Sequence, residues 1–225
     1  MKFKDLSRIR KAIIDKNDDE VIKLHQMYID KIPKPALAFP IKCFPSDRVD
    51  TFSTAFIPDD IPIPNHEIVA IKTLGNGNCL YNSVSYLLCR NYSLSSALRL
   101  LTAAELYRNA NNYTHHPKLL ASIEDPEINY EPETLFSILL TDEAACAETT
   151  DKIELVKLEA KRTAENKNWS GMLDLMALTT VLKCQIWSVY LYCNKNVRSL
   201  LSGIIKPVDS YGNRGNMQRD CNFYF

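Results

Sequence analysis

Apolar residues recur at helical spacing along most of this chain, and charged residues occupy the intervening positions. Spacings of three and four residues predict amphipathic helices, whereas strict alternation of apolar and polar residues predicts strands. The pattern predicts helices over 6–14, 21–27, 80–88, 95–111, 132–140, 151–164 and 171–183. Strands are expected over 67–72 and 185–192, and the tail from 212 is expected to be a loop with a short final strand. Ser95 or Ser96 and Ser170 are the expected helix caps.

Prolines interrupt the pattern between positions 32 and 64, where seven of them predict an extended, poorly helical connector. We therefore place a domain boundary near Pro64. Residues 1–64 would form an N-terminal helical segment with a proline-rich connector. Residues 65–225 would form the main domain.

The composition of the 225 residues is that of a soluble globular protein, with 46% hydrophobic and 24% charged residues. Lys plus Arg and Asp plus Glu both number 27, so the net charge does not favour nucleic acid as the partner of this domain. No apolar run reaches the roughly 18 residues that a membrane span needs. We expect no membrane association.

The seven cysteines show neither the spacing of a disulfide framework nor that of a zinc site. They stand at positions 43, 79, 89, 146, 184, 193 and 221. We expect no metal and no cofactor, and free thiols in a reducing intracellular compartment, cytoplasmic or nuclear.

One cysteine, Cys79, ends a glycine-rich turn, Gly75-Asn76-Gly77-Asn78, between a predicted strand and a predicted helix. Glycines allow positive φ, and the start of a helix offers free N–H groups and a partial positive charge. Such an environment stabilises a thiolate, so Cys79 is a candidate nucleophile. The alternative interpretation is a small apolar residue of the core.

The segment from Gly75 to Ser85 resembles the Asp-Gly-Asn-Cys-Leu-Phe motif of the OTU (ovarian tumour) cysteine proteases, most of which are deubiquitinases. A second match is Trp169-Ser170-Gly171 followed by an apolar helix and a strand, which is similar to the later Trp-Gly-Gly unit of that family. Residues 78–104 also resemble the OTU-like domains of transposon-derived and vertnin-like animal proteins, a subgroup that includes a nuclear, DNA-associated regulator. The resemblance covers about residues 67–207.

This resemblance implies a helix-rich α/β (α+β) fold of the papain-like OTU type, with a small central sheet packed between helices. It implies that Cys79 is the nucleophile for an isopeptide bond and that the loop Gly75, Asn76, Gly77, Asn78 forms the oxyanion hole. One oxyanion donor is typically worth ~3 kcal/mol. Ubiquitin or a ubiquitin-like protein would be the partner. Asn76 replaces the aspartate of the family motif, and its amide can still hydrogen-bond the loop.

The family takes its catalytic histidine from a strand near the end of the domain, but this chain has histidines only at 25, 66, 115 and 116. The general base therefore has no occupant in the expected place. The domain could be incomplete before that strand, which the unusual tail over 213–225 favours. It could instead be an inactive module that keeps a ubiquitin-binding or other protein-binding surface. His115 or His116 could also act as a substitute base, although both are expected in a surface turn.

Overall fold

Helices make up most of this fold, which we describe from a computed structural model covering residues 6–33, 45–58, 68–190, 195–208 and 223–224. The helices are α1 (Leu6–Ile14), α2 (Asp18–Ile29), the 3₁₀ turn η2 (Ser46–Arg48), α3 (Thr51–Thr54), α4 (Cys79–Cys89), α5 (Ser95–Arg108), α6 (Ala110–Thr114), α7 (Pro117–Ile123), α8 (Pro132–Leu139), α9 (Asp142–Ala145), α10 (Lys152–Thr163), α11 (Met172–Leu182) and α12 (Lys195–Leu201). The strands are β1 (Val49–Asp50), β2 (Ala70–Ile71), β3 (Ile186–Ser188), β4 (Gly203–Ile205) and β5 (Phe223–Tyr224). The fold is α+β, as the sequence predicted.

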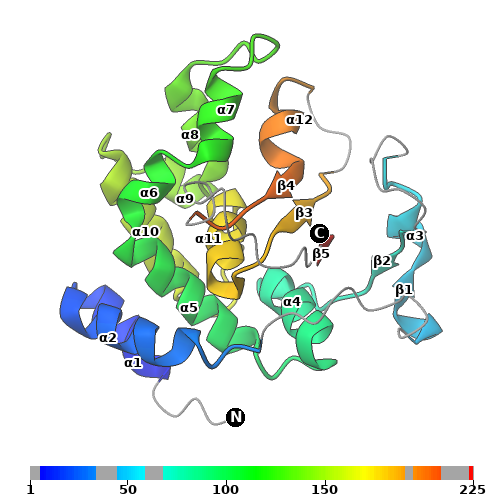
Figure 1. The fold of residues 1–225 in the computed structure, drawn as a ribbon, viewed down its shortest axis with the longest axis horizontal. Helices are drawn as coiled ribbons and strands as arrows, with labels where there is room; N and C mark the ends of the chain where they lie inside the picture. Colours follow the sequence, from blue (N-terminus) through cyan, green and yellow to red (C-terminus); the bar gives the residue numbers. More distant parts are fainter. Residues whose placement is uncertain (1–5, 34–44, 59–67, 191–194, 209–222, 225) are drawn as a thin grey trace, which may run out of the picture.

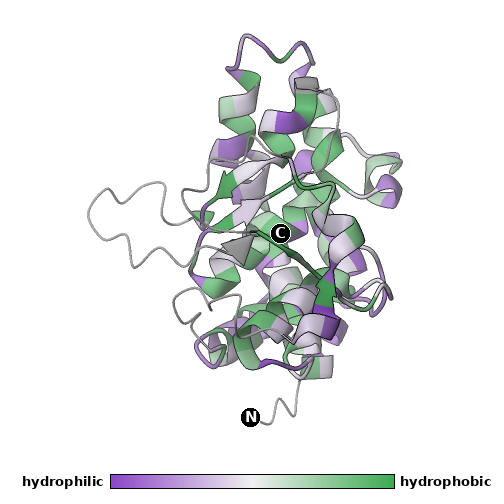
Figure 2. Cartoon of the chain, turned by 90° about the vertical axis from the view of Figure 1, so that its right-hand side faces the viewer, coloured by the Kyte–Doolittle hydropathy of each residue, from purple (hydrophilic) through white to green (hydrophobic). Residues whose placement is uncertain are grey.

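The core is built around α5, which packs against α10 and α11 and also contacts α1, α2 and α4 (Figure 1). Leu98, Leu101 and Leu106 of this helix are completely buried. A helix buried on nearly all sides belongs to the centre of a core rather than to its surface. Most helices carry both hydrophobic and hydrophilic positions along the ribbon (Figure 2).

The two N-terminal helices pack on α5, where Tyr107 donates a 2.9 Å hydrogen bond to Asp18. Asn17 separates α1 from α2 and caps α2 by accepting a 3.1 Å hydrogen bond from the N–H of Glu20. The predicted separation of two helices between residues 14 and 21 is therefore confirmed. The proposed boundary at Pro64 lies outside the described residues.

Two small sheets flank α4 and α11. β1 and β2 pair antiparallel, with Val49 opposite Ile71, and the other sheet has the order β4-β3-β5. β3 pairs antiparallel with β4 and parallel with β5. The predicted strands over 67–72 and 185–192 exist but are shorter, because pairing extends over only two and three residues of them. Positions 191–192 and most of the tail lie outside the described residues.

Part of the proline-rich connector predicted between positions 32 and 64 is folded, and the sequence did not predict this. Its described residues 45–58 contain η2, β1 and the single turn α3. Asp50 nucleates this turn by accepting hydrogen bonds from the N–H and the hydroxyl of Ser53, at 3.1 and 2.8 Å. These hydrogen bonds lower the pKa of Asp50. A side-chain cap therefore allows a helical turn to form within a proline-rich segment.

Three predictions about helix ends and faces were wrong. Ser95 is the first residue of α5 rather than its cap, because Leu94 occupies that position. Gly171, not Ser170, is the N-cap of α11. The alternating Lys and Glu residues of the helix predicted over 151–164 were expected to face solvent, but the side chain of Glu159 on α10 is completely buried.

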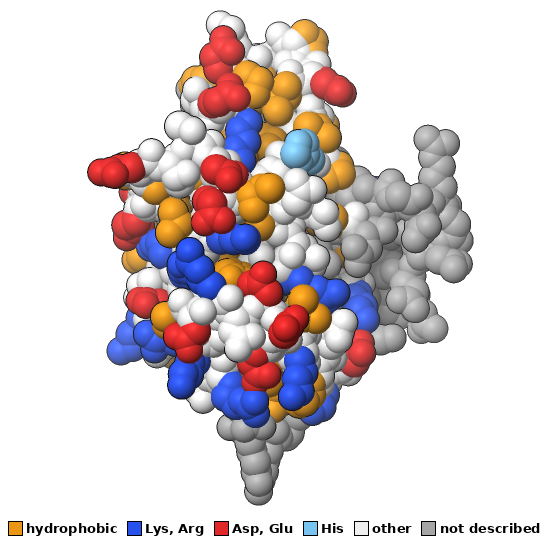
Figure 3. Space-filling model, turned by 90° about the vertical axis from the view of Figure 1, so that its left-hand side faces the viewer, with side chains coloured by type: hydrophobic (Ala, Val, Ile, Leu, Met, Phe, Trp, Pro, Cys, Tyr) orange, Lys and Arg blue, Asp and Glu red, His pale blue; other side chains and the backbone are white. Residues whose placement is uncertain are grey.

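The surface formed by the left-hand elements of Figure 1 carries basic and acidic side chains interspersed with one another (Figure 3). Within the part of the chain that the structure describes, no helix has the length and hydropathy needed to cross a bilayer.

Candidate functional site: the Cys79 turn

Cys79 is the first residue of α4 and is half-buried. The turn before it depends on Gly77, which has a φ of +76°. A Cβ atom at Gly77 would lie 1.8 Å from the carbonyl oxygen of Lys167, so only glycine fits there. Gly75, by contrast, has no neighbour within 4 Å of such an atom. The predicted glycine turn is confirmed, and its tight contact is with the turn between α10 and α11.

Two asparagines shape the turn through their side chains. Asn76 accepts a 3.2 Å hydrogen bond from the N–H of Asn78 and a 3.3 Å hydrogen bond from the side-chain amide of Asn82. Asn78 donates a 2.9 Å hydrogen bond to the side chain of Asn166. A neutral amide at position 76 is thus sufficient to form an Asx turn.

Arg99 of α5 holds the Cys79 turn against the turn between α10 and α11. Its guanidinium is buried, with 2% of the residue exposed, and its Nε donates a 2.8 Å hydrogen bond to the Asn78 side chain. The remaining donors bind backbone carbonyls of both turns, those of Gly77, Thr163, Glu165 and Asn168. The guanidinium also lies over the Tyr81 ring, 4.6 Å from its centroid. The planar fork of arginine suits this set of acceptors, which a lysine could not reproduce.

The Trp169-Ser170-Gly171 unit contacts the start of α4, just after the Cys79 turn. Ser170 donates a 3.2 Å hydrogen bond to the hydroxyl of Tyr81, which follows Cys79 by two residues. Trp169 itself is 65% exposed. These contacts join the two matched segments across α4 and the start of α11.

Two buried carboxylates lie behind this junction. Asp174 accepts hydrogen bonds from the N–H of Gly171, at 2.9 Å, and from the hydroxyl of Thr163. Burial, together with the smaller effect of the neighbouring Glu159, raises the pKa of Asp174 to about 7. Burial also raises the pKa of Glu159, which accepts hydrogen bonds from the N–H and hydroxyl of Thr141. Their role is to fix the ends of α10 and α11.

The described histidines lie on α2 and around the start of α7, not on α4 or in the Cys79 turn. His25 on α2 is buried, its Nε2 lies 3.3 Å from a carboxylate oxygen of Glu105, and burial lowers its pKa to about 4. His115 is exposed and its Nδ1 lies 2.8 Å from the hydroxyl of Thr114. α2 and α7 lie at different edges of the molecule, away from the start of α4 (Figure 1).

His116 corrects the expectation of a plain surface turn. It is completely buried, caps α7 by accepting a 3.2 Å hydrogen bond from the N–H of Lys118, and stacks on Tyr113. Burial lowers the pKa of His116 to about 4. The ring is therefore neutral at physiological pH and serves packing. His66 lies outside the described residues.

The cysteines that the structure describes, Cys79, Cys89, Cys146 and Cys184, are all free thiols. The described part of the chain contains no group of three or more His, Cys, Asp or Glu side chains that could hold a metal ion. Within the same residues, the sulfur of Cys79 forms no hydrogen bond.

Cys79 and its loop were predicted from the sequence, whereas Arg99 and Asp174 were not. Arg99 stands in the apolar stripe from Ala97 to Ala104, and a lone arginine at a buried helix position was a usable signal. Asp174, three residues after Gly171, is the acidic N3 position of a capping pattern.

Comparison with known proteins agrees with this arrangement. The family model described as the OTU domain of vertnin matches residues 70–218. Vertnin of the mouse, Mus musculus, is 26% identical over 172 residues, which cover 71% of this chain and 20% of the mouse protein. The chain thus spans about a fifth of the length of that relative, and no solved structure matches it. Since the family model covers well over half of the chain, the chain belongs to the vertnin-type OTU domain family.

Proposed function

We propose that this OTU domain is a protein-binding module that retains the nucleophile loop but does not hydrolyse isopeptide bonds. The observation that carries the proposal is the placement of the histidines. His25 and His116 are neutral and buried in the core, and His115 bonds to its own helix end. None of these three supplies a base on the elements around Cys79.

Thiol catalysis requires a thiolate and an acid for the leaving amine. A helix N-terminus contributes about 0.3–1 kcal/mol, which is less than one pKa unit for a thiol at 1.36 kcal/mol per unit. It also cannot return a proton to the leaving group. The free N–H groups at the start of α4 can therefore bind a carbonyl group without completing a reaction.

Ubiquitin or a ubiquitin-like protein is the partner class that the OTU resemblance favours. A second candidate function is thiol isopeptidase activity, which is favoured by one observation: the Cys79 turn keeps the strand, glycine turn and helix geometry of a nucleophile loop. The nuclear or cytoplasmic setting of either function remains a prediction.

A ubiquitin probe with a thiol-reactive group at its C-terminus separates the two functions. The wild type and Cys79→Ala would be incubated with the probe beside an active OTU protease, and adducts would be detected by mass spectrometry. Iodoacetamide labelling of Cys79 in the wild type would show that the thiol is accessible. We expect iodoacetamide labelling but no ubiquitin adduct. An adduct that forms in the wild type and disappears in Cys79→Ala would refute the binding-module proposal and establish the isopeptidase.

A further inference from the structure

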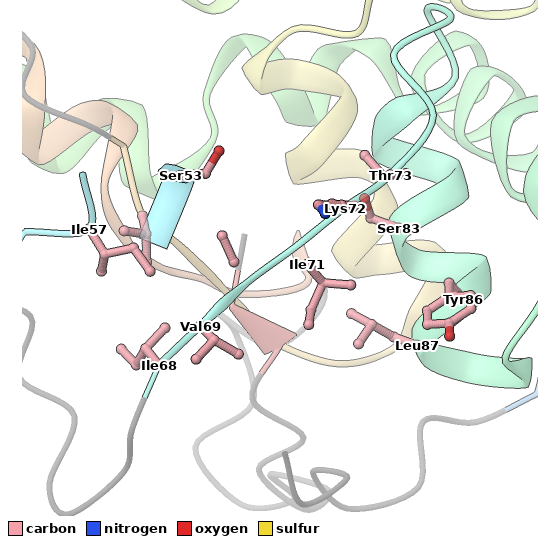
Figure 4. Close-up of a pocket in the computed structure, with 12 residues that line it drawn as sticks. Ser53, Ile57, Ile68, Val69, Ile71, Lys72, Thr73, Ser83, Tyr86 and Leu87 are labelled. Atoms are coloured by element: carbon pink, nitrogen blue, oxygen red, sulfur yellow. The ribbon is translucent and has the colours of Figure 1, made fainter. Parts of the chain in front are cut away.

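An apolar groove of about 280 Å³ runs along α4 beyond the Cys79 turn (Figure 4). One wall consists of Ser83, Tyr86 and Leu87 of α4. The opposite wall is the segment 68–73, which contains β2, with contributions from α3 and from Val189 after β3. Ser83 lies one helical turn after Cys79 and donates a 2.8 Å hydrogen bond to its carbonyl group. The groove is therefore separate from the thiol but shares the same helix.

The wall formed by β2 has an unpaired strand edge. The N–H of Lys72 binds the carbonyl of Arg48 at 2.7 Å, and the N–H of Ala70 binds the hydroxyl of Thr54 at 2.9 Å, so both point toward β1 and α3. Alternation directs the peptide groups of Val69, Ile71 and Thr73 to the other edge.

Figure 1 places α4 on that other side of β2. In the described residues, the backbone groups of Val69, Ile71 and Thr73 have no hydrogen-bond partner. An open strand edge is a template for a further strand. The backbone of the groove therefore favours an extended peptide over a helix.

The side chains specify the chemistry of that peptide. The lining is mainly apolar, and Lys72 is the single charged residue among the lining residues that the structure describes. Lys72 neighbours Ile71 in the strand, so the two side chains point to opposite faces of it, and the Lys72 ammonium donates a 3.5 Å hydrogen bond to the carbonyl of Asp47. Phe52, which precedes the lining residue Ser53 in the chain, is 74% exposed, and its ring meets that of Phe56 edge-on at 5.0 Å. Exposed aromatic residues are enriched at protein interfaces.

We propose that this groove binds an extended segment of a partner protein, with alternating apolar side chains and an acidic residue opposite Lys72, which adds as a strand to the free edge of β2. This inference rests on the proposed binding function. It assigns the partner contact to a surface outside the Cys79 turn.

A phage-displayed library of random nonapeptides tests the proposal without a known partner. Selection on Cys79→Ala protein keeps the result independent of thiol chemistry. A failure of the groove proposal can therefore be distinguished from a failure of the proposal that the domain lacks isopeptidase activity. We expect enriched peptides with apolar residues at every second position and an Asp or Glu between them. Selection on Lys72→Glu, an exposed substitution that leaves the core intact, should enrich Lys or Arg at that place instead. No enrichment, or the same sequences from both selections, would overturn the proposal.

The position of the bound strand is tested by hydrogen exchange on the complex with the most enriched peptide. Added pairing should slow exchange of the Ile71 and Thr73 amides at least tenfold. Replacing the apolar residue that pairs there by proline, which lacks an N–H, should weaken binding at least tenfold. Protection elsewhere, or equal binding of the proline peptide, would refute strand addition. Protection of the same two amides by ubiquitin would assign the groove to a modifier and would refute the acidic-peptide partner.

Discussion

Arg99 is expected to be the side chain whose removal most disturbs the Cys79 turn. Arg99→Met keeps the length and the apolar stem of the residue but removes every donor to Asn78 and to four carbonyl groups. The carbonyls of Gly77 and Thr163 belong to buried residues and cannot recover these bonds from water. An unsatisfied buried group costs about 1–3 kcal/mol, and removal of a buried charge offsets part of this. We expect a loss of about 3–4 kcal/mol in the free energy of unfolding.

Urea denaturation monitored by circular dichroism would measure this loss. Arg108→Met at the exposed end of the same helix is the matched control and should change the free energy of unfolding by about 0.5 kcal/mol or less. Below the unfolding transition, Arg99→Met should also increase the rate at which iodoacetamide labels Cys79, since the turn loses its anchor. A loss below about 1 kcal/mol with unchanged labelling would refute the assignment of Arg99 as the residue that holds the two turns together.

Further predictions concern the turn, the buried acid and the histidines. Gly77→Ala should destabilise the protein by more than about 3 kcal/mol because its Cβ would collide with backbone, whereas Gly75→Ala should be nearly neutral; urea denaturation of both tests the contrast. The pKa of Asp174 is raised from 3.8 to about 7, so between these pH values its carboxyl group is protonated in the native state but ionised in the unfolded state. The free energy of unfolding should therefore fall as pH rises from about 4 to 7. Asp174→Asn, which can still accept the N–H bond of its cap, should flatten that fall by up to about 1.4 kcal/mol per pH unit, and an unchanged pH profile would contradict the assignment. His116→Ala should lower the melting temperature because a buried cap is lost, and His115→Ala should leave it unchanged; the reverse order would mean that the cap is not structural.

The sequence predicted those parts of the fold in which periodicity and local geometry agree. The helix that starts at Cys79 and the apolar helix that ends near Lys183 were both placed correctly. Their patterns span several turns, so neighbouring residues reinforce each other. The positive φ of Gly77 agrees with the expectation that glycines in this turn allow such a conformation, which Gly75 does not adopt.

What the sequence could not show depends on long-range contacts. Arg99 binds carbonyl groups more than sixty residues away, and no local pattern records such a partner. Glu159 looked like part of a charged face because its burial depends on Thr141, which lies on another segment. Strand ends were overestimated for a similar reason, since pairing partners rather than propensity decide where a strand stops.

The Cys79 turn shows why a catalytic motif and catalytic activity can be separated in one domain. Gly77 is required by the contact with Lys167, and Asn78 is required by Arg99 and Asn166, whether or not any reaction occurs. The loop that would stabilise an oxyanion is also the junction that connects α4, α5 and the turn before α11. The loss of a catalytic base would therefore remove none of the packing reasons for keeping these residues. The motif alone reports the architecture of the domain, and activity has to be judged from the sulfur of Cys79 and the groups around it.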